Sequence, residues 1–161
     1  MDLDVKKLML VLLERQKEYV LEDLESYSCA MVAVFAADGQ SYLTFPKFED
    51  EISKIEAYAS IVKRAKLIHA AIIITVNAAR YSASTGVEEI DDYRWGDFDE
   101  TNSRPCILLT ASGPDVESCS LQLGYEIAKG KVLFDQEPEM LYRIMLNLLP
   151  DWPGRESRVA N

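Results

Sequence analysis

The sequence predicts a single α+β domain in which helices pack on a mainly antiparallel sheet of about five to six strands. Two patterns lead to this prediction: apolar and polar residues alternate strictly over 118–127, and apolar residues recur at helical spacing over 46–68. The expected element order is α-β-β-α-β-β-β(-β)-α. We expect the domain to span residues 1–150 and to be followed by a mobile tail over 151–161, which holds few apolar residues.

Composition narrows the classes of protein. The chain has 161 residues, 48% of them hydrophobic and 27% charged, which favours one packed domain over a disordered tail or a coiled coil. The net charge of −10 argues against nucleic acid as a partner, because phosphate contacts need clustered Lys and Arg. The longest apolar runs, Leu8–Leu13 and Ala70–Ile74, are far shorter than the roughly 18–20 residues that cross a bilayer, so no membrane partner is expected. Three widely spaced cysteines without a C-x-x-C pair indicate a reduced, cytoplasmic protein.

The N-terminal part predicts a helix followed by a β-hairpin. Residues 3–27 contain good helix formers and neither Gly nor Pro. Strands are expected over Cys29–Ala36 and Ser41–Phe45. The Asp38-Gly39 step between them supplies the positive φ that a tight hairpin turn requires.

A second helix is predicted to begin near Pro46, with Thr44 as its candidate N-cap. Its core-facing stripe is expected to combine two rows of apolar residues, Phe48, Ile52, Ile55, Ala59 and Val62 in the first and Tyr58, Ile61, Ala65 and Ile68 in the second. The basic residues Lys63, Arg64 and Lys66 fall in its last turns, where positive charge complements the helix dipole.

The remaining chain predicts further strands and a final helix. Ala70–Asn77 and Arg104–Ala111 are nearly continuous apolar runs, typical of strands covered on both faces. After a turn at Gly113-Pro114-Asp115, one face of the alternating strand is expected to bury Cys119, Leu121, Leu123, Tyr125 and Ile127, while the other face is wet or covered by a partner. A turn at Lys129-Gly130-Lys131 leads to a short strand over Val132–Phe134. A last helix is expected to present Leu141, Ile144, Met145 and Leu148 on one face before Pro150 ends it.

This order of elements is similar to that of the roadblock, longin and profilin-like group of domains, and the similarity carries no motif. Residues 70–134 also resemble a group of small uncharacterised bacterial proteins. The shared features are an apolar strand, an acidic polar loop, a Leu-Leu-Thr strand, the alternating strand and a Lys-Gly-Lys-Val hairpin. Neither resemblance implies an activity or a site residue.

A long loop over 79–103 carries the strongest functional signal. Between residues 88 and 103 it holds seven acids against one base, Arg94, and aromatic residues lie among the acids. Such a mixture is typical of interface anchors, so the candidate partner-binding residues are Tyr81, Tyr93, Trp95, Asp97, Phe98 and Asp99. A solvated, mobile loop and an irregular divalent-cation site are the alternatives. An EF-hand beginning at Asp97 is excluded, because Asn102 and Leu108 stand where Gly and Glu are required.

The sequence assigns no catalytic residue, no cofactor and no metal. None of the seven glycines belongs to a phosphate-binding or nucleophile-elbow motif. His69, the only histidine, is expected at a helix end or at the core margin rather than as a general base. Cys106 and Cys119 are expected as buried free thiols, and Cys29 as the most reactive of the three cysteines, although no basic residue flanks it.

The preferred hypothesis is a non-catalytic domain that acts through protein–protein contacts, including self-association. It would serve as an adaptor or as an inhibitor or immunity-type protein, and a heterologous partner should carry a basic contact patch. The alternative is a small-molecule or divalent-cation sensor with its site between the sheet and the 79–103 loop. An enzyme that uses Cys29, His69 or the loop carboxylates ranks third.

Overall fold

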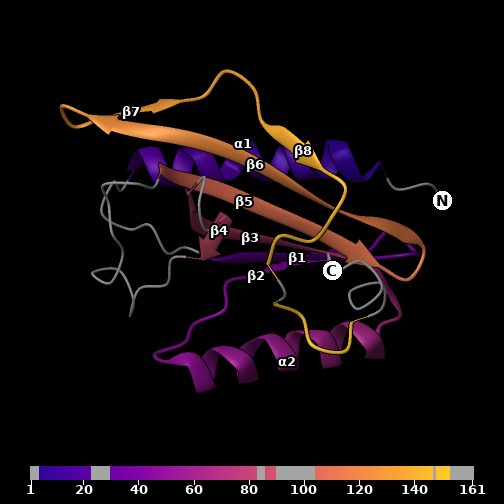
Figure 1. Cartoon of the computed structure of the whole chain (residues 1–161). Coiled ribbons are helices and arrows are strands. Elements are labelled where there is room, and N and C mark those ends of the chain that lie inside the picture. Colours follow the sequence, from indigo (N-terminus) through magenta and orange to yellow (C-terminus); the bar gives the residue numbers. More distant parts are fainter. Residues whose placement is uncertain (1–3, 23–29, 83–85, 90–103, 147, 153–161) are drawn as a thin grey trace.

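The computed structural model describes residues 4–22, 30–82, 86–89, 104–146 and 148–152 (Figure 1). In these residues the order is helix, two strands, helix and six further strands. The elements are α1 (Val5–Glu22), β1 (Met31–Ala36), β2 (Ser41–Thr44), α2 (Glu51–Leu67), β3 (Ala70–Ser82), β4 (Gly86–Glu89), β5 (Arg104–Gly113), β6 (Val116–Ala128), β7 (Lys131–Phe134) and β8 (Glu139–Leu141). The predicted α+β class, the antiparallel pairing and the packing of helices on the sheet are confirmed.

One antiparallel sheet contains all the described strands. Its order is β2-β1-β3-β5-β6-β7, with β4 paired to β3 and β8 paired to β6. Strands β2 and β7 are therefore the two ends of this order. The sheet exceeds the expected size of about five to six strands because β3 continues past Asn77 to pair with β4, and because the C-terminal segment contributes β8.

The two helices cover opposite faces of the sheet, α1 on one side and α2 on the other (Figure 1). Successive side chains of a strand point to opposite faces, so β3 serves both cores. Its Ile72 and Ile74 pack with α1, and Ile73 packs with α2. The alternation predicted for β6 is confirmed from Cys119 to Tyr125, which belong to the α1 core, whereas Ile127 is exposed.

Helix α2 begins later than predicted, at Glu51 rather than near Pro46, and its N-cap is Asp50 rather than Thr44. The Ser53 N–H donates to Asp50 Oδ1 at 2.8 Å, and the Asp50 N–H donates to Ser53 Oγ at 3.1 Å. This capping box satisfies two backbone donors at the helix start. Thr44 is the last residue of β2 and lies too far before the helix to bond to these donors.

The buried face of α2 also differs from the predicted stripe. Lys54, Tyr58, Val62 and Ala65 are buried, while Ile52 and Ile55 are 70% and 57% exposed. The helix is turned so that the Tyr58 hydroxyl accepts a buried hydrogen bond of 3.1 Å from Asn77 Nδ2 on β3. A polar contact across the core therefore helps set the rotation of this helix. The predicted stripe is confirmed at Tyr58, Val62 and Ala65 and is wrong at Ile52 and Ile55.

The predicted last helix over 141–148 is wrong. Residues Glu139–Leu141 form β8 instead, and in the rest of the described C-terminal segment Ile144 and Leu149 bury their side chains without helical structure. Ser120 of β6 holds this segment: its hydroxyl donates to the Arg143 carbonyl at 2.8 Å and accepts from the Met145 N–H at 3.3 Å. Strand pairing and these side-chain bonds replace the hydrogen bonds that a helix would make.

The end of the described chain is anchored on the α2 face. Trp152 is buried and its Nε1–H donates to the Ser112 carbonyl of β5 at 2.9 Å. Trp152, which the sequence predicted to lie in a mobile tail over 151–161, is therefore anchored. Residues 153–161 lie outside the described part. The polar face of β6, expected to be wet or partner-covered, is covered at Ser118 and Ser120, and the protein's own C-terminal segment binds the Ser120 hydroxyl.

Candidate functional site

Most of the sequence-predicted contact residues lie outside the described part of the chain: Tyr93, Trp95, Asp97, Phe98 and Asp99. Tyr81 is placed in β3, where its backbone lies opposite Val87 of β4 and Arg104 of β5. The expected loop over 79–103 is therefore too long. Residues 79–82 continue β3 and residues 86–89 form β4, which leaves 90–103 as the candidate segment.

The cysteines behave as the sequence predicted where they are described. Cys106 and Cys119 are buried free thiols, and the Cys119 thiol lies 3.7 Å from the Met9 sulfur. They cannot face each other, because Cys106 lies opposite Gly124 and Cys119 lies opposite Ala111. Burial raises the pKa of Cys106 to about 12 and also raises that of Cys119, so neither is an activated nucleophile. Cys29 lies outside the described residues.

His69 ends α2 rather than lining a site. It is exposed, its φ of 52° is left-handed, and its backbone N–H donates to the Lys66 carbonyl at 3.2 Å. This is the geometry with which many helices stop. The prediction of a helix-end histidine is confirmed, and the described structure gives it no partner side chain for general-base chemistry.

The strongest described candidate for a contact surface is the edge strand β2. Its turn follows the predicted Asp38-Gly39 step: the Gly39 N–H donates to the Ala36 carbonyl at 3.1 Å, the Ala36 N–H donates to the Gln40 carbonyl at 2.8 Å, and Gly39 has a φ of 92°. In the described part of the chain β2 pairs only with β1. One side of its backbone therefore lacks a strand partner.

The hydrogen-bond pattern shows which residues of β2 turn their backbone outward. Because Ala36 bonds to Gln40, alternation along the ladder directs the backbone N–H and C=O of Tyr42 and Thr44 to β1. The same groups of Ser41 and Leu43 then point away from the sheet. These are the groups that an added strand would use.

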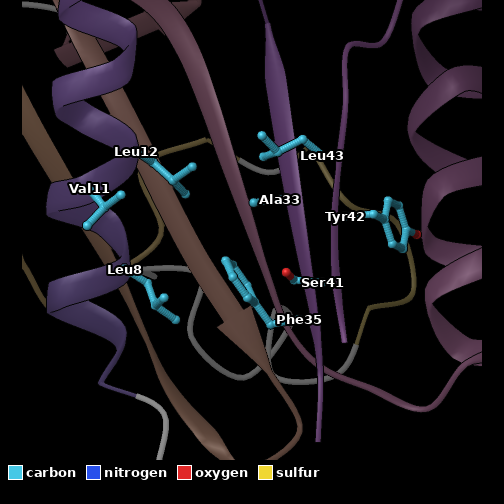
Figure 2. A pocket seen from close by; sticks show the side chains of 8 residues that line it. All are labelled: Leu8, Val11, Leu12, Ala33, Phe35, Ser41, Tyr42 and Leu43. Carbon is cyan, nitrogen blue, oxygen red and sulfur yellow. The ribbon is translucent and has the colours of Figure 1, made fainter. Parts of the chain in front are cut away.

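An apolar groove of about 430 Å³ runs between β2 and α1 (Figure 2). Leu8, Val11 and Leu12 form its helical wall, while Phe35 and Leu43 lie on the strand side. Its residues are Leu8, Val11, Leu12, Ala33, Phe35, Ser41, Tyr42 and Leu43. We call this set the α1–β2 groove.

Two features of the fold leave the α1–β2 groove open. Helix α1 packs over β3 and β5, so it does not cover β1 and β2 at the end of the sheet. The strand floor there also carries the small side chains of Ala33 and Ser41. Val11 on the helical rim is 63% exposed as a result.

The opposite face of β2 is closed by α2. The Arg64 guanidinium carbon lies 4.6 Å from the centroid of the Tyr42 ring, and Figure 2 shows that this ring points toward α2 and away from the groove. Burial raises the pKa of the Tyr42 hydroxyl. A binding partner at β2 would therefore contact the α1 side of the sheet, through Ser41 and Leu43.

Acidic residues surround the edge strand. Asp38 precedes β2, and Glu49, Asp50 and Glu51 follow it; all four are exposed, with Lys47 as the only exposed base between residues 38 and 51. Hydrogen bonds from Ser53 lower the pKa of Asp50, so this carboxylate stays charged. Residues 38–51 therefore hold four acids and one base, while Arg64 of α2 brings a positive charge to the Tyr42 ring on the other face of β2.

A row of polar side chains is buried on the α2 face but does not form an open site. Thr75, Thr110 and Ser120 lie opposite one another on β3, β5 and β6, and the Thr110 and Ser120 hydroxyls are 3.5 Å apart. The Ser120 hydroxyl is bonded to the backbone of the C-terminal segment at Arg143 and Met145. Ser120 thus holds this segment in place through two hydrogen bonds.

Sequence reasoning missed the α1–β2 groove, although signals for it were present. The helix predicted over 3–27 is confirmed over Val5–Glu22, with residues 3 and 23–27 outside the described part, but the side chains on its strand-facing flank were not matched to the hairpin. A short second strand with a small residue, Ser41, between aromatic and aliphatic neighbours is what left the hollow. Only the sheet order shows that this hairpin lies at an edge.

Comparisons with protein-family models, with curated proteins and with solved structures returned no match for this chain. Among the residues that the structure describes, no helix is both long and apolar enough to cross a bilayer. Within the same residues, no three His, Cys, Asp or Glu side chains gather as a metal-binding group.

Proposed function

We propose that this protein works through protein–protein contacts, as an adaptor or an inhibitor-type domain, and that β2 with the α1–β2 groove is its contact surface. The single observation that supports this is the combination of an unpaired strand edge and an adjoining apolar groove. Folded proteins usually protect such edges with charge, proline or a covering segment. Strand β2, with the sequence Ser-Tyr-Leu-Thr, has no charged residue and no proline.

The other end of the sheet is also an edge, but it carries charge. Beside β7, Arg104 donates two hydrogen bonds to Asp135, at 3.0 and 3.3 Å, and lies 3.7 Å from Glu126. Strand β7 itself begins with Lys131, an edge charge that disfavours pairing with another chain. The contrast favours β2 over β7 as the functional edge.

The proposal also retains the aromatic and acidic residues of segment 90–103 as a second contact region, on the sequence pattern alone. A basic partner fits both regions, since the net charge of the chain is −10. We further propose self-association and a cytoplasmic location. The free thiols of Cys106 and Cys119 support the location.

A small-molecule sensor is the second candidate, and one observation favours it. The α1–β2 groove measures about 430 Å³, within the usual size range of ligand pockets. An apolar ligand would be expected there, because Ser41 is the one polar side chain that the groove offers besides the Tyr42 ring.

The test is a quantitative co-purification from cells of the native host with the wild-type protein, Val11→Glu and Leu133→Glu. Leu133 on β7 is 57% exposed and makes a matched control at the opposite edge. We expect at least one protein, or a second copy of the chain, to be retained by wild type and Leu133→Glu and lost with Val11→Glu. Equal retention by all three proteins would contradict a contact function for this surface.

A further inference from the structure

We propose that the partner is an extended segment of another protein, which adds to β2 as a further strand, places apolar side chains at alternate positions in the α1–β2 groove and carries basic residues at its ends. This inference rests on the contact function proposed above and specifies its partner. Three independent properties of the β2 edge support it: backbone, shape and charge.

The backbone property is the outward direction of the Ser41 and Leu43 peptide groups. Two residues separated by one position present two N–H and two C=O groups on one line, which is the template for an added antiparallel or parallel strand. A rounded partner surface cannot satisfy these groups together. An extended chain can, and main-chain hydrogen bonds then supply affinity independent of sequence.

The shape property is the position of the groove on one face of the sheet only. Ser41 and Leu43 point into the α1 side, and the residues of an added strand that lie beside them would point to the same side. Side chains two positions apart in a strand are about 6.6 Å apart. Alternate apolar residues of the segment would therefore lie beside Ser41 and Leu43 at the open side of the groove, toward the exposed Val11, while the residues between them face α2.

The charge property is the excess of acid in the segments that precede and follow β2. Asp38 lies in the turn before β2, and Glu49 and Glu51 follow β2 in the connection to α2 and at the start of that helix. Lys47 offsets only part of this charge. The chain as a whole carries a net charge of −10, so basic residues are favoured at the ends of an added strand and acidic residues are disfavoured.

A second copy of this chain fits the same surface less well. Two copies joined through β2 would have their α1 helices about five strand spacings apart, roughly 24 Å, because each helix lies over β3 and beyond. Helices about 10 Å wide would not touch across that distance, and both grooves would stay open. Each copy would also bring the same acidic flanks and a net charge of −10.

The probe for the test is a fluorescently labelled synthetic peptide of about ten residues, with Thr-Val-Thr-Leu-Thr-Val between two pairs of lysines. Three control peptides change one property each. One has the apolar and Thr residues regrouped so that they no longer alternate, one has glutamates in place of the lysines, and one carries N-methyl groups on the amides of alternate residues. Binding is measured by anisotropy with the full-length protein, and the amide resonances of Ser41 and Leu43 are followed by NMR.

We expect the parent peptide to bind and to shift the Ser41 and Leu43 amides, with about tenfold or greater loss of affinity for each control peptide. Val11→Glu and Ser41→Trp should weaken binding to a similar extent, the first by placing a charge on the rim and the second by filling the groove. Leu133→Glu should bind as wild type. Circular dichroism of each variant verifies that it is folded.

Other outcomes separate this inference from the proposed function. If no peptide binds but the protein forms dimers that Val11→Glu disrupts, the surface is a contact surface and its occupant is a second copy, so the inference fails alone. If the parent and regrouped peptides bind with equal affinity, the inference also fails, because binding then does not depend on apolar side chains at alternate positions. If only an apolar fluorescent fatty acid binds in the groove, the inference and the proposed contact function fail together.

Discussion

The thiol of Cys106 is expected to be unreactive because it is buried. It lies in the third position of β5, beside Ala79 of β3 and in one buried cluster with Leu108, and burial raises its pKa to about 12. The thiolate, which is the reactive form, is therefore scarce at neutral pH. We expect Cys106 and Cys119 to resist iodoacetamide at pH 8 in the folded protein and to react fully in guanidinium, as read by the mass of peptides that contain them.

The same shift has a consequence for stability at high pH. A thiol with a raised folded-state pKa contributes stability in full below its unfolded pKa, near 9.0. That contribution is lost as pH rises toward about 12, because the unfolded state releases its proton first.

For the iodoacetamide experiment, rapid alkylation of both cysteines in the native protein at pH 8 would show that they are accessible and would contradict the buried assignment.

Gly113 is expected to be the least replaceable glycine in the described chain. A Cβ at this position would lie 1.9 Å from the Ala71 carbonyl oxygen, a backbone atom that cannot move aside cheaply. At Gly130 a Cβ meets nothing within 4 Å, although the φ of 75° disfavours other residues. Gly130→Ala should therefore cost about 1 kcal/mol, and Gly113→Ala clearly more. Thermal melts that rank the two variants in the opposite order would contradict the close approach of β5 to β3.

At the scale of elements, the start of α2 depends on the capping box rather than on Thr44. Asp50→Ala should lower the melting temperature, Asp50→Ser should preserve it, and Thr44→Ala should not disturb the helix start. Since the pKa of Asp50 is lowered, its contribution to stability is present above the ordinary aspartate pKa of 3.8 and is lost as pH falls through the folded-state pKa. The difference in melting temperature between wild type and Asp50→Ala should thus shrink at acid pH. A constant difference would contradict this role of the carboxylate.

The C-terminal segment is a second element that long-range contacts decide. Replacing Trp152 by Ala removes a buried indole and its bond to the Ser112 carbonyl, and we expect a loss of about 3 to 5 kcal/mol in the free energy of unfolding. Trp152→Phe retains much of the apolar area and should lose less. Urea unfolding of both variants measures the two effects, and a neutral Trp152→Ala would show that the segment does not dock as described.

These elements show where sequence reasoning succeeds and where it ends. Period-two alternation in β6 and the Asp38-Gly39 turn are local signals, and each was enough to predict its element correctly. The helix expected over 141–148 failed because its apolar spacing also suits a segment held by Ser120, a residue about twenty positions earlier in the chain. In α2 the stripe was predicted correctly at Tyr58 and wrongly at Ile52 and Ile55, and the hydrogen bond that orients Tyr58 comes from Asn77, 19 positions later in the chain.

For the candidate site the limit is topological. Each residue of the α1–β2 groove could be assigned to its element from the sequence, yet the groove exists only because β2 ends the sheet and α1 lies over β3 and β5. Strand order is a property of long-range pairing that local patterns do not encode. The sequence predicted a contact site in the acidic segment because its composition can be read from the sequence, whereas an unpaired strand edge cannot.

At the scale of the whole molecule, the net charge of −10 is what should keep the β2 edge of one copy from pairing with another at neutral pH. The sequence pI is about 4.6, so lowering the pH from 7 toward 5 removes most of the repulsion between copies. An uncharged, unpaired strand edge next to exposed apolar side chains is then expected to associate. Sedimentation velocity should accordingly detect a larger share of dimers and larger species of the wild-type protein near pH 5 than at pH 7 in low salt.

The variants used for the contact surface identify the edge responsible. Val11→Glu and Leu133→Glu each add one negative charge, so they change the repulsion between copies equally and differ only in the end of the sheet they alter. We expect Val11→Glu to delay association to lower pH and Leu133→Glu to follow wild type within the effect of one charge. If both variants begin to associate at the same lowered pH, net charge alone governs association. If only Leu133→Glu lowers the pH at which association begins, the edge responsible is β7 and not β2.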